Sequence, residues 1–260
     1  MSIVFGLLFS AIFALVPKQV VDLKNAGIVG GTSVGSAYVY PFVVAIVQDN
    51  TVVCGGALIS SNRVLTAGHC LSQIDYTNAV VYAHRFDLRT SLESEDAAAY
   101  RILGASPHPN YISGNTEYDA AILSLELIRG RTPAVQVYLD TGYLVTTNQF
   151  LTVAGWGDLR NFATVSGSPI MMEVPLPVTT DAVCIQQNPI IKNIESQFCA
   201  GYIRKGRDAC FGDSGGPAFV KNSDGTFTLG GIVGLGQGCG IRPSVFTKVY
   251  AIEPWIRRYL

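Results

Sequence analysis

Charged residues are scarce in this chain of 260 residues, since Lys, Arg, Asp and Glu make up only 14% of it and the net charge is -1. Nucleic-acid-binding domains carry an excess of basic residues, and disordered chains combine high net charge with few apolar residues. The hydrophobic fraction of 48% also argues against disorder. We therefore expect a compact globular protein with no nucleic-acid partner, long enough for one or two domains.

Long apolar runs are lacking after residue 16. The one such run, residues 3–16, has no charge and has the length of a signal-peptide core, which is too short to span a bilayer. A buried N-terminal strand or helix is the alternative interpretation. We expect residues 1–16 to be a signal peptide with an undefined cleavage point, and the protein to be secreted, with no membrane contact after the signal is removed. The chain also lacks an Asn-x-Ser/Thr sequon, so N-glycosylation is not expected.

Cys-x-x-Cys pairs are absent, and His69 beside Cys70 lacks the ligand spacing of a zinc finger, so we expect no metal site. An even number of cysteines is typical of a protein made in an oxidising compartment. The spacing alone leaves the connectivity of up to three disulfides open. The six residues are Cys54, Cys70, Cys184, Cys199, Cys210 and Cys239.

Helical periodicity is weak until the C-terminus, where Trp255, Ile256, Tyr259 and Leu260 fall at helical spacing behind Pro254, a suitable first-turn residue. Short β-branched and aromatic runs fill the rest, and Asn222-Ser-Asp224-Gly225 is typical of a hairpin turn. We predict an all-β protein with antiparallel sheet and a C-terminal α-helix. The expected strands are residues 42–47, 56–59, 79–82, 121–125, 151–154 and 227–233.

One stretch, Gly212-Asp213-Ser214-Gly-Gly-Pro217, offers a nucleophile and its anion trap together. A serine hydroxyl needs an adjacent base, and the oxyanion formed after attack needs preorganised donors. The backbone N–H groups of Gly212 and Ser214 are candidates for those donors. The same residues are all good turn formers, so a plain surface turn is the alternative.

A histidine and an aspartate could complete this chemistry. His69 follows a predicted strand and is flanked by small residues, and Asp119 stands at the entry to an apolar run. A buried carboxylate can fix the tautomer of a histidine and stabilise its imidazolium. Taken singly, His69 is more typical of a hydrogen-bonded structural residue than of a base, and Asp119 is typical of a strand-end or capping residue.

Four motifs in order resemble the trypsin/chymotrypsin family of secreted serine endopeptidases: residues 28–31 (Ile-Val-Gly-Gly), 66–70 (Thr-Ala-Gly-His-Cys), 119–123 (Asp-Ala-Ala-Ile-Leu) and 212–217. The resemblance spans residues 28–260. It implies two six-stranded antiparallel β-barrels, residues 28–136 and 137–260, with the active site in the cleft between them and the crossover at residues 133–142.

The resemblance also implies roles. His69 is similar to the family's general base, Asp119 to its orienting carboxylate and Ser214 to its nucleophile, with the oxyanion hole at the N–H groups of Gly212 and Ser214. It implies disulfides joining Cys54 to Cys70, Cys184 to Cys199, and Cys210 to Cys239. No cofactor is implied.

Asp208 matches the carboxylate at the base of the family's specificity pocket, which implies cleavage after Lys or Arg because a buried carboxylate needs a cationic partner. Without the resemblance, a solvated loop residue is the simpler interpretation. Gly234, Gly236 and Ser244 match the pocket walls. Ser244 replaces a usual glycine and is expected to narrow the slot. Gly234 and Leu235 replace the family's Ser-Trp, which removes a hydrogen bond to the triad carboxylate and an apolar platform.

Activation is implied at Ile28, whose freed ammonium group would pair with Asp213 after removal of a propeptide, residues 17–27. Gly27 precedes Ile28 where many members carry Lys or Arg, so we expect a separate activating protease, with cleavage at Lys24 followed by trimming as the alternative. Partners are thus protein or peptide substrates, this activating protease and possible protein inhibitors, and we expect a monomer. The alternative is a secreted homologue with weak or no activity that serves as a binding or inhibitory module. The acidic Glu93, Glu95 and Asp96 are expected to form a solvated loop rather than a calcium site.

Overall fold

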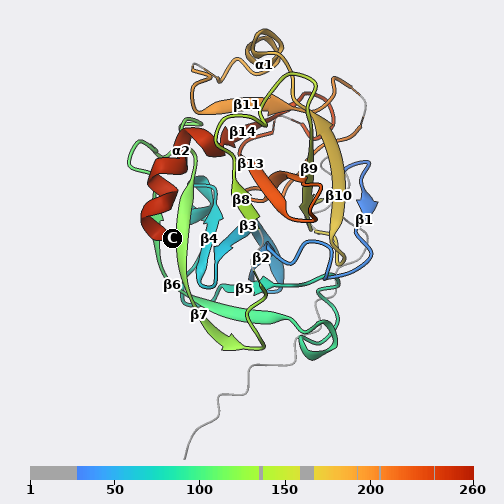
Figure 1. Cartoon of the computed structure of the whole chain (residues 1–260), viewed down its shortest axis with the longest axis vertical. Helices are drawn as coiled ribbons and strands as arrows, with labels where there is room; N and C mark the ends of the chain where they lie inside the picture. Colours follow the sequence, from blue (N-terminus) through green and yellow to red (C-terminus); the bar gives the residue numbers. More distant parts are fainter. Residues whose placement is uncertain (1–27, 135–136, 159–166, 192, 205, 237) are drawn as a thin grey trace, which may run out of the picture.

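The computed structural model describes residues 28–134, 137–158, 167–191, 193–204, 206–236 and 238–260 (Figure 1). The expected signal peptide and propeptide lie outside these ranges. Among the described residues, no helix combines the length and the apolar character that crossing a bilayer requires.

The first half of the chain forms a closed six-stranded barrel, in the order β2-β3-β4-β7-β6-β5, with every neighbouring pair antiparallel. Asp49 and Asn50, with φ angles of 49° and 62°, form a tight turn between β2 and β3, as expected for a two-residue hairpin. The strands are β2 (Val43–Gln48), β3 (Thr51–Ser60), β4 (Arg63–Thr66), β5 (Val80–Ala83), β6 (Ala98–Pro107) and β7 (Ala121–Arg129).

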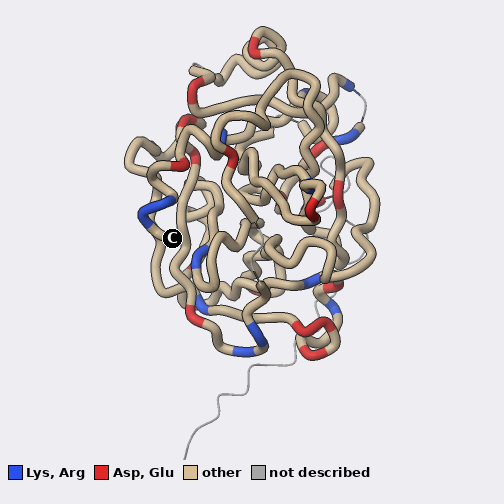
Figure 2. The backbone as a smooth tube through the Cα atoms, viewed as in Figure 1, with Lys and Arg blue, Asp and Glu red and all other residues tan. Residues whose placement is uncertain are grey.

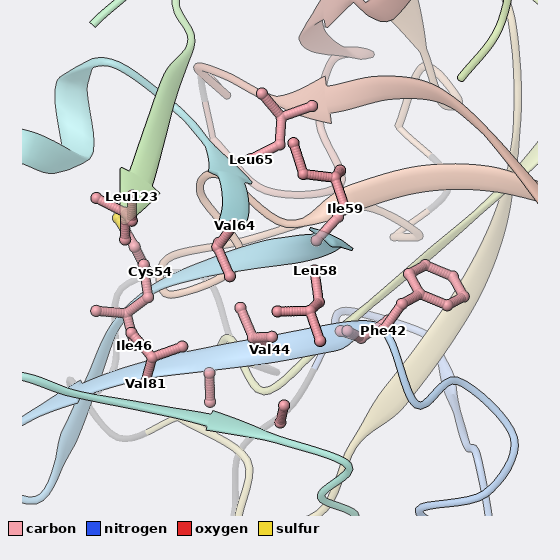
Figure 3. Packing of buried hydrophobic residues seen from close by; sticks show 14 of the residues in the cluster. Phe42, Val44, Ile46, Cys54, Leu58, Ile59, Val64, Leu65, Val81 and Leu123 are labelled. Carbon is pink, nitrogen blue, oxygen red and sulfur yellow. The ribbon is translucent and has the colours of Figure 1, made fainter. Parts of the chain in front are cut away.

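Aliphatic side chains from facing strands fill this barrel. Val44, Leu58 and Leu65 have none of their surface exposed, and Figure 3 shows them packed with neighbours from β2, β3 and β4. Burial of a side chain of this size contributes about 1.5–3 kcal/mol relative to leaving it in water. The barrel therefore gives a rigid base for the loops at its rim.

The second half forms an eight-stranded sheet in the order β1-β10-β9-β12-β13-β14-β11, with β8 paired to β13. The β8–β13 pairing is parallel, so the expectation of a purely antiparallel sheet is wrong at this point. The end strand β11 approaches the end of β10 through an isolated bridge between Val178 and Ala200, and Thr179 N and Gly201 N donate to Cys199 O and Pro177 O, each at 2.9 Å. The strands are β1 (Thr32–Ser33), β8 (Val137–Leu139), β9 (Phe150–Gly155), β10 (Met172–Pro177), β11 (Gln197–Ala200), β12 (Pro217–Lys221), β13 (Phe227–Val233) and β14 (Ser244–Lys248).

The C-terminal helix is confirmed, but α2 (Val249–Ile256) begins five residues before Pro254, which lies inside it. The prediction that Pro254 opens the helix is wrong because Val249 and Ile252 are buried and extend the apolar face backwards. A second helix, α1 (Asp181–Gln187), was not expected. Its signal was Thr180, whose hydroxyl accepts a hydrogen bond from Val183 N at 3.2 Å as an N-cap.

Each end of the described chain lies against the opposite half. β1 pairs with β10 of the second sheet, although it precedes the first barrel in sequence. The helix α2 runs beside the first barrel in Figure 1, and the ring of Trp255 packs 4.9 Å from that of His108. These crossings fix how the two halves sit against each other.

Candidate active site

His69 and Asp119 are brought together by two paired strands of the barrel. β4 ends at Thr66, opposite Ala121 at the start of β7, so the residues just beyond these strand ends are neighbours. His69 Nδ1 lies 2.7 Å from Asp119 Oδ2, and the backbone N–H of His69 donates to Asp119 Oδ1 at 2.8 Å. Asp119 is 1% exposed. A carboxylate partner places the imidazole proton on Nδ1 and leaves the Nε2 lone pair free to accept a proton.

The second half of the chain supports Asp119 from behind. Thr247 Oγ1 donates to the carbonyl oxygen of Asp119 at 2.9 Å. A Cβ atom built on Gly234 would lie 3.7 Å from Asp119 Oδ2, so a serine hydroxyl there could reach the carboxylate. Glycine supplies no such donor, and within the described ranges His69 is the one residue that donates hydrogen bonds to the Asp119 carboxylate.

Ser214 lies in a loop that packs on the same strand end. Its carbonyl oxygen accepts from Gly55 N at 2.7 Å, and the next N–H, of Gly215, donates to Val233 O at 2.7 Å. Gly215 has a φ of +79°, and a Cβ there would collide with Thr66 Oγ1, so only glycine allows this approach. Cys70 Sγ bridges the region, lying 3.7 Å from Ser214 O and 4.0 Å from His69 Nε2.

The backbone around Ser214 leaves two donors unused. Gly212 adopts a φ of +91°, a conformation that L side chains rarely adopt. Among the residues that the structure describes, neither the N–H of Gly212 nor that of Ser214 takes part in a hydrogen bond. The Ser214 hydroxyl likewise makes no hydrogen bond within the described part of the chain, to His69 Nε2 or to any other group. Catalytic hydrogen bonds are often long in structures without substrate. Two free N–H groups flank the hydroxyl and can receive an oxyanion.

Asp213 is completely buried beside these donors. Its Oδ1 accepts from Gly157 N at 2.8 Å and its Oδ2 from Cys210 N at 2.9 Å. Burial raises the pKa of Asp213 to about 7, and the charges of Asp208 and Asp158 push in the same direction. No cation pairs with it in the described ranges. Ile28, expected to be its partner, is itself fully buried, among the apolar residues of the second sheet.

Asp208 is near enough to Asp213 for its charge to raise the pKa of Asp213, and it is 1% exposed. Ser244 Oγ donates to its Oδ1 at 2.7 Å, and Gly240 N donates to its Oδ2 at 3.0 Å. Burial raises the pKa of Asp208 to about 6, although these hydrogen bonds oppose the shift. A Cβ built on Gly236 would lie 3.0 Å from Ser244 Oγ. The hydroxyl of Ser244 therefore stands between the wall at Gly236 and the carboxylate.

The cysteines form three disulfides, Cys54–Cys70, Cys184–Cys199 and Cys210–Cys239, of which the first and the last border the site. These are the pairings that the resemblance implied. The first lies directly beside His69, and the last joins the loop of Asp213 to the segment next to Gly240. Within the described residues, Cys54, His69 and Cys70 are the one group near enough to share a metal, but both sulfurs are oxidised and cannot act as thiolate ligands.

The acidic loop is exposed at Glu93 and Asp96, as expected, but Glu95 is partly buried beside a buried arginine. Arg85 is 2% exposed and pairs with Glu95 at 3.3 Å, and Glu93 pairs with Arg129. This loop follows β5, and in Figure 2 its acidic positions gather at one end of the molecule. Sequence reasoning missed Arg85 because its partners are mainly backbone carbonyls, which leave no sequence signature.

The chain is similar to known proteins over a range that includes every residue of the candidate site. The family model described as Trypsin matches residues 28–256. The trypsin of Simulium vittatum is 34% identical over 203 residues, which are 76% of this chain and 76% of that protein. Cathepsin G of Mus musculus is 30% identical over 239 residues, covering 90% of this chain and 86% of that protein.

Two longer Drosophila melanogaster proteins are also similar. The serine protease filzig is 31% identical over 250 residues, 90% of this chain, and the serine proteinase stubble is 31% identical over 216 residues, 80% of this chain. The chain spans only 14% of the first and 27% of the second.

Proposed function

Because the chain belongs to the trypsin family and is a serine-type endopeptidase, we propose that it cuts peptide bonds after Lys or Arg through an acyl-enzyme on Ser214. The observation that carries the proposal is the hydrogen-bonded pair of His69 and Asp119 beside the loop of Ser214. We assign residues 28–260 to one peptidase unit of two barrels, the second completed at the bridge between Val178 and Ala200.

The reaction follows from the free groups of the site. His69 Nε2 takes the proton of the Ser214 hydroxyl while its oxygen attacks the substrate carbonyl. The tetrahedral oxyanion accepts hydrogen bonds from the N–H groups of Gly212 and Ser214. Asp119 stabilises the imidazolium, which then protonates the leaving amine. Water, activated by the same imidazole, hydrolyses the acyl-enzyme and restores Ser214.

The substrate class follows from Asp208. Burial without a cation keeps this carboxylate at a high free energy, and a Lys or Arg side chain of the substrate lowers it by pairing. Ser244 already occupies one side of Oδ1, so a slender ammonium group fits more easily than a planar guanidinium. We therefore assign a preference for Lys over Arg.

Activation and location complete the proposal. The protein is secreted as a precursor, and a separate protease cuts after Gly27, because a trypsin-like specificity does not favour that bond. The freed ammonium of Ile28 then pairs with Asp213. The fully buried Asp213, which lacks a cation among the described residues, supports this step. We expect the mature enzyme to act on protein or peptide substrates as a monomer.

The test is to prepare the chain with Ile28 as its N-terminus and to measure cleavage of peptide libraries at pH 8. Cleavage after Lys or Arg is expected, and Ser214→Ala should reduce kcat by about 10⁴- to 10⁶-fold, the range known for such triads. Labelling by an organophosphate checks the assembled triad independently. A folded protein that neither cleaves nor labels would instead favour a binding or inhibitory module.

A further inference from the structure

Arg85 organises the loop after β5 from within. Its guanidinium donates to three backbone carbonyls, those of Asp87, Thr90 and Ser91, at 2.7, 2.9 and 3.1 Å. Glu95, its ion-pair partner, accepts from the N–H groups of Phe86 and Asp87 at 3.1 and 2.8 Å. The two side chains thus hold both the carbonyl and the N–H groups of one tight loop. Removing Arg85 would take one donor from each of these carbonyls and would leave the partly buried Glu95 carboxylate without its cation.

The outer edge of this loop is hydrogen-bonded to the second half of the chain. The carbonyl oxygen of Phe86 accepts from Trp156 Nε1 at 3.1 Å and from Met171 N at 2.8 Å. Leu88 N donates to Pro169 O at 2.8 Å. The loop of the first barrel therefore fixes both the indole of Trp156 and the segment that leads into β10.

Trp156 is directly followed by the residue that holds Asp213. Trp156 is 1% exposed, and Gly157 N donates to Asp213 Oδ1 at 2.8 Å. A Cβ built on Gly212 would lie 3.1 Å from Gly157 Cα, so Gly157 also supports the donor loop sterically. Any shift of Trp156 thus reaches both Asp213 and Gly212.

We propose that Arg85 is a positioning residue for the oxyanion hole, acting through Phe86, Trp156 and Gly157 on Asp213. The inference rests on the proposed catalytic role of Gly212 and Ser214. The guanidinium suits this task because it stays charged at every working pH and its fixed fork binds several oxygens at once. Substrate contacts at Asp208 lie elsewhere, so the effect should fall on turnover rather than on binding.

The experiment compares Arg85→Met, Arg85→Lys and Trp156→Phe in the form that starts at Ile28. Trp156→Phe removes the indole N–H together with part of the buried ring, leaves Arg85 in place, and serves if Arg85→Met fails to fold. Arg101→Met is the matched control, because Arg101 is an exposed barrel residue paired with exposed Glu126. Active-site titration restricts each kcat to folded, competent enzyme.

Arg85→Met should lower kcat about 10- to 100-fold with KM unchanged, less than the loss of an oxyanion donor itself, with partial recovery in Arg85→Lys. Trp156→Phe should lower kcat about fivefold. Activity of the wild-type enzyme should decline at alkaline pH as the Ile28 ammonium loses its proton. In Arg85→Met this decline should move to lower pH, because a misplaced Asp213 stabilises the ammonium less. Asp208 and Asp158, which also face Asp213, are unchanged in all variants.

The double variant, Arg85→Met with Trp156→Phe, should have the same kcat as Arg85→Met alone, because both changes interrupt the same series of contacts. The proposal would be overturned if the folded variants kept the wild-type kcat and the wild-type pH of alkaline decline. It would also be overturned if the losses of kcat in the two single variants were fully additive in the double variant. Failure of the wild-type enzyme to cleave any peptide would be a different result, since it would refute the proposed function itself.

Discussion

The two halves of the molecule treat their buried charges in opposite ways. In the first barrel, Arg85 meets Glu95 and three carbonyls, and Asp119 meets His69 through both carboxylate oxygens. In the second half, Asp208 and Asp213 are at least as deeply buried, yet backbone N–H groups and one hydroxyl are their only described hydrogen-bond donors. Arg85 and Asp119 each have an ionisable side chain as partner, whereas neither Asp208 nor Asp213 has a cationic side chain beside it in the described part of the chain.

This difference indicates how activity can be controlled without a large rearrangement. An unpaired buried carboxylate is costly, and each missing cation can come from outside the folded core. We assign one to the new N-terminus at Ile28 and the other to the substrate. Activation and substrate recognition then use the same physical principle at neighbouring positions.

The largest expected effect comes from removing the carboxylate of Asp208, which we propose to pair with the cationic side chain of the substrate. Asp208→Ser should lower kcat/KM for Lys and Arg substrates about 10²- to 10⁴-fold, because a buried pairing is lost, and cleavage after apolar residues should rise. Cleavage of a peptide library by the wild-type enzyme and by Asp208→Ser measures this change in specificity. An unchanged cleavage profile would contradict the role of Asp208, and Ser214→Ala in the same assay gives the background cleavage.

The next effect is on stability. The raised pKa of Asp213, about 7 against 3.8, means that its stabilising contribution is full below the unfolded pKa and is lost as pH rises through 7. In the uncut precursor, the free energy of unfolding should fall between pH 4 and pH 8, by roughly 4 kcal/mol at most. In the form cut before Ile28, the ammonium group should largely offset this loss.

Urea unfolding of both forms across this pH range measures the difference. Asp208, whose pKa is raised to about 6, changes the free energy of unfolding in the same direction in both forms, so its contribution cancels in the difference between them. His108 also cancels, although burial lowers its pKa, so that its contribution is present above its unfolded pKa and lost as pH falls. Parallel pH profiles for the two forms would refute the pairing of Ile28 with Asp213.

The smallest effect concerns the hydroxyl that covers Asp208. Ser244→Gly removes one hydrogen bond and opens space next to Gly236, so cleavage after Arg should gain about fivefold relative to cleavage after Lys. Ser244→Ala is the control, since it removes the bond and keeps most of the volume. An Arg to Lys ratio that stays constant in both variants would show that Ser244 does not set the preference.

Much of the fold was predictable from short-range patterns. Each of the six expected strands overlaps an observed one, and the turn at residues 222–225 joins β12 to β13 as expected. The sequence motifs also named His69 and Asp119 before geometry placed them 2.7 Å apart. These features depend on local periodicity, turn residues and ordered motifs, all of which are visible in one sequence.

The missed features depend on tertiary contacts. β1 and β8 have only 2 and 3 residues, too few for any periodicity to emerge. The early start of α2 depends on burial of Val249 and Ile252 rather than on the rule for Pro254. Arg85 was invisible because an arginine in a loop is ordinarily solvated, and only the folded chain reveals the carbonyls around it.

The crossed chain ends have a consequence for cleavage between the halves. Because β1 reaches back to β10 and Trp255 reaches back to His108, each half carries a piece of the other. Cleavage of the backbone at exposed Arg131, between β7 and β8, would therefore yield two fragments that stay associated without any covalent link. Two separately expressed pieces, ending and beginning there, should reassemble into a single particle on mixing, held by their exchanged ends.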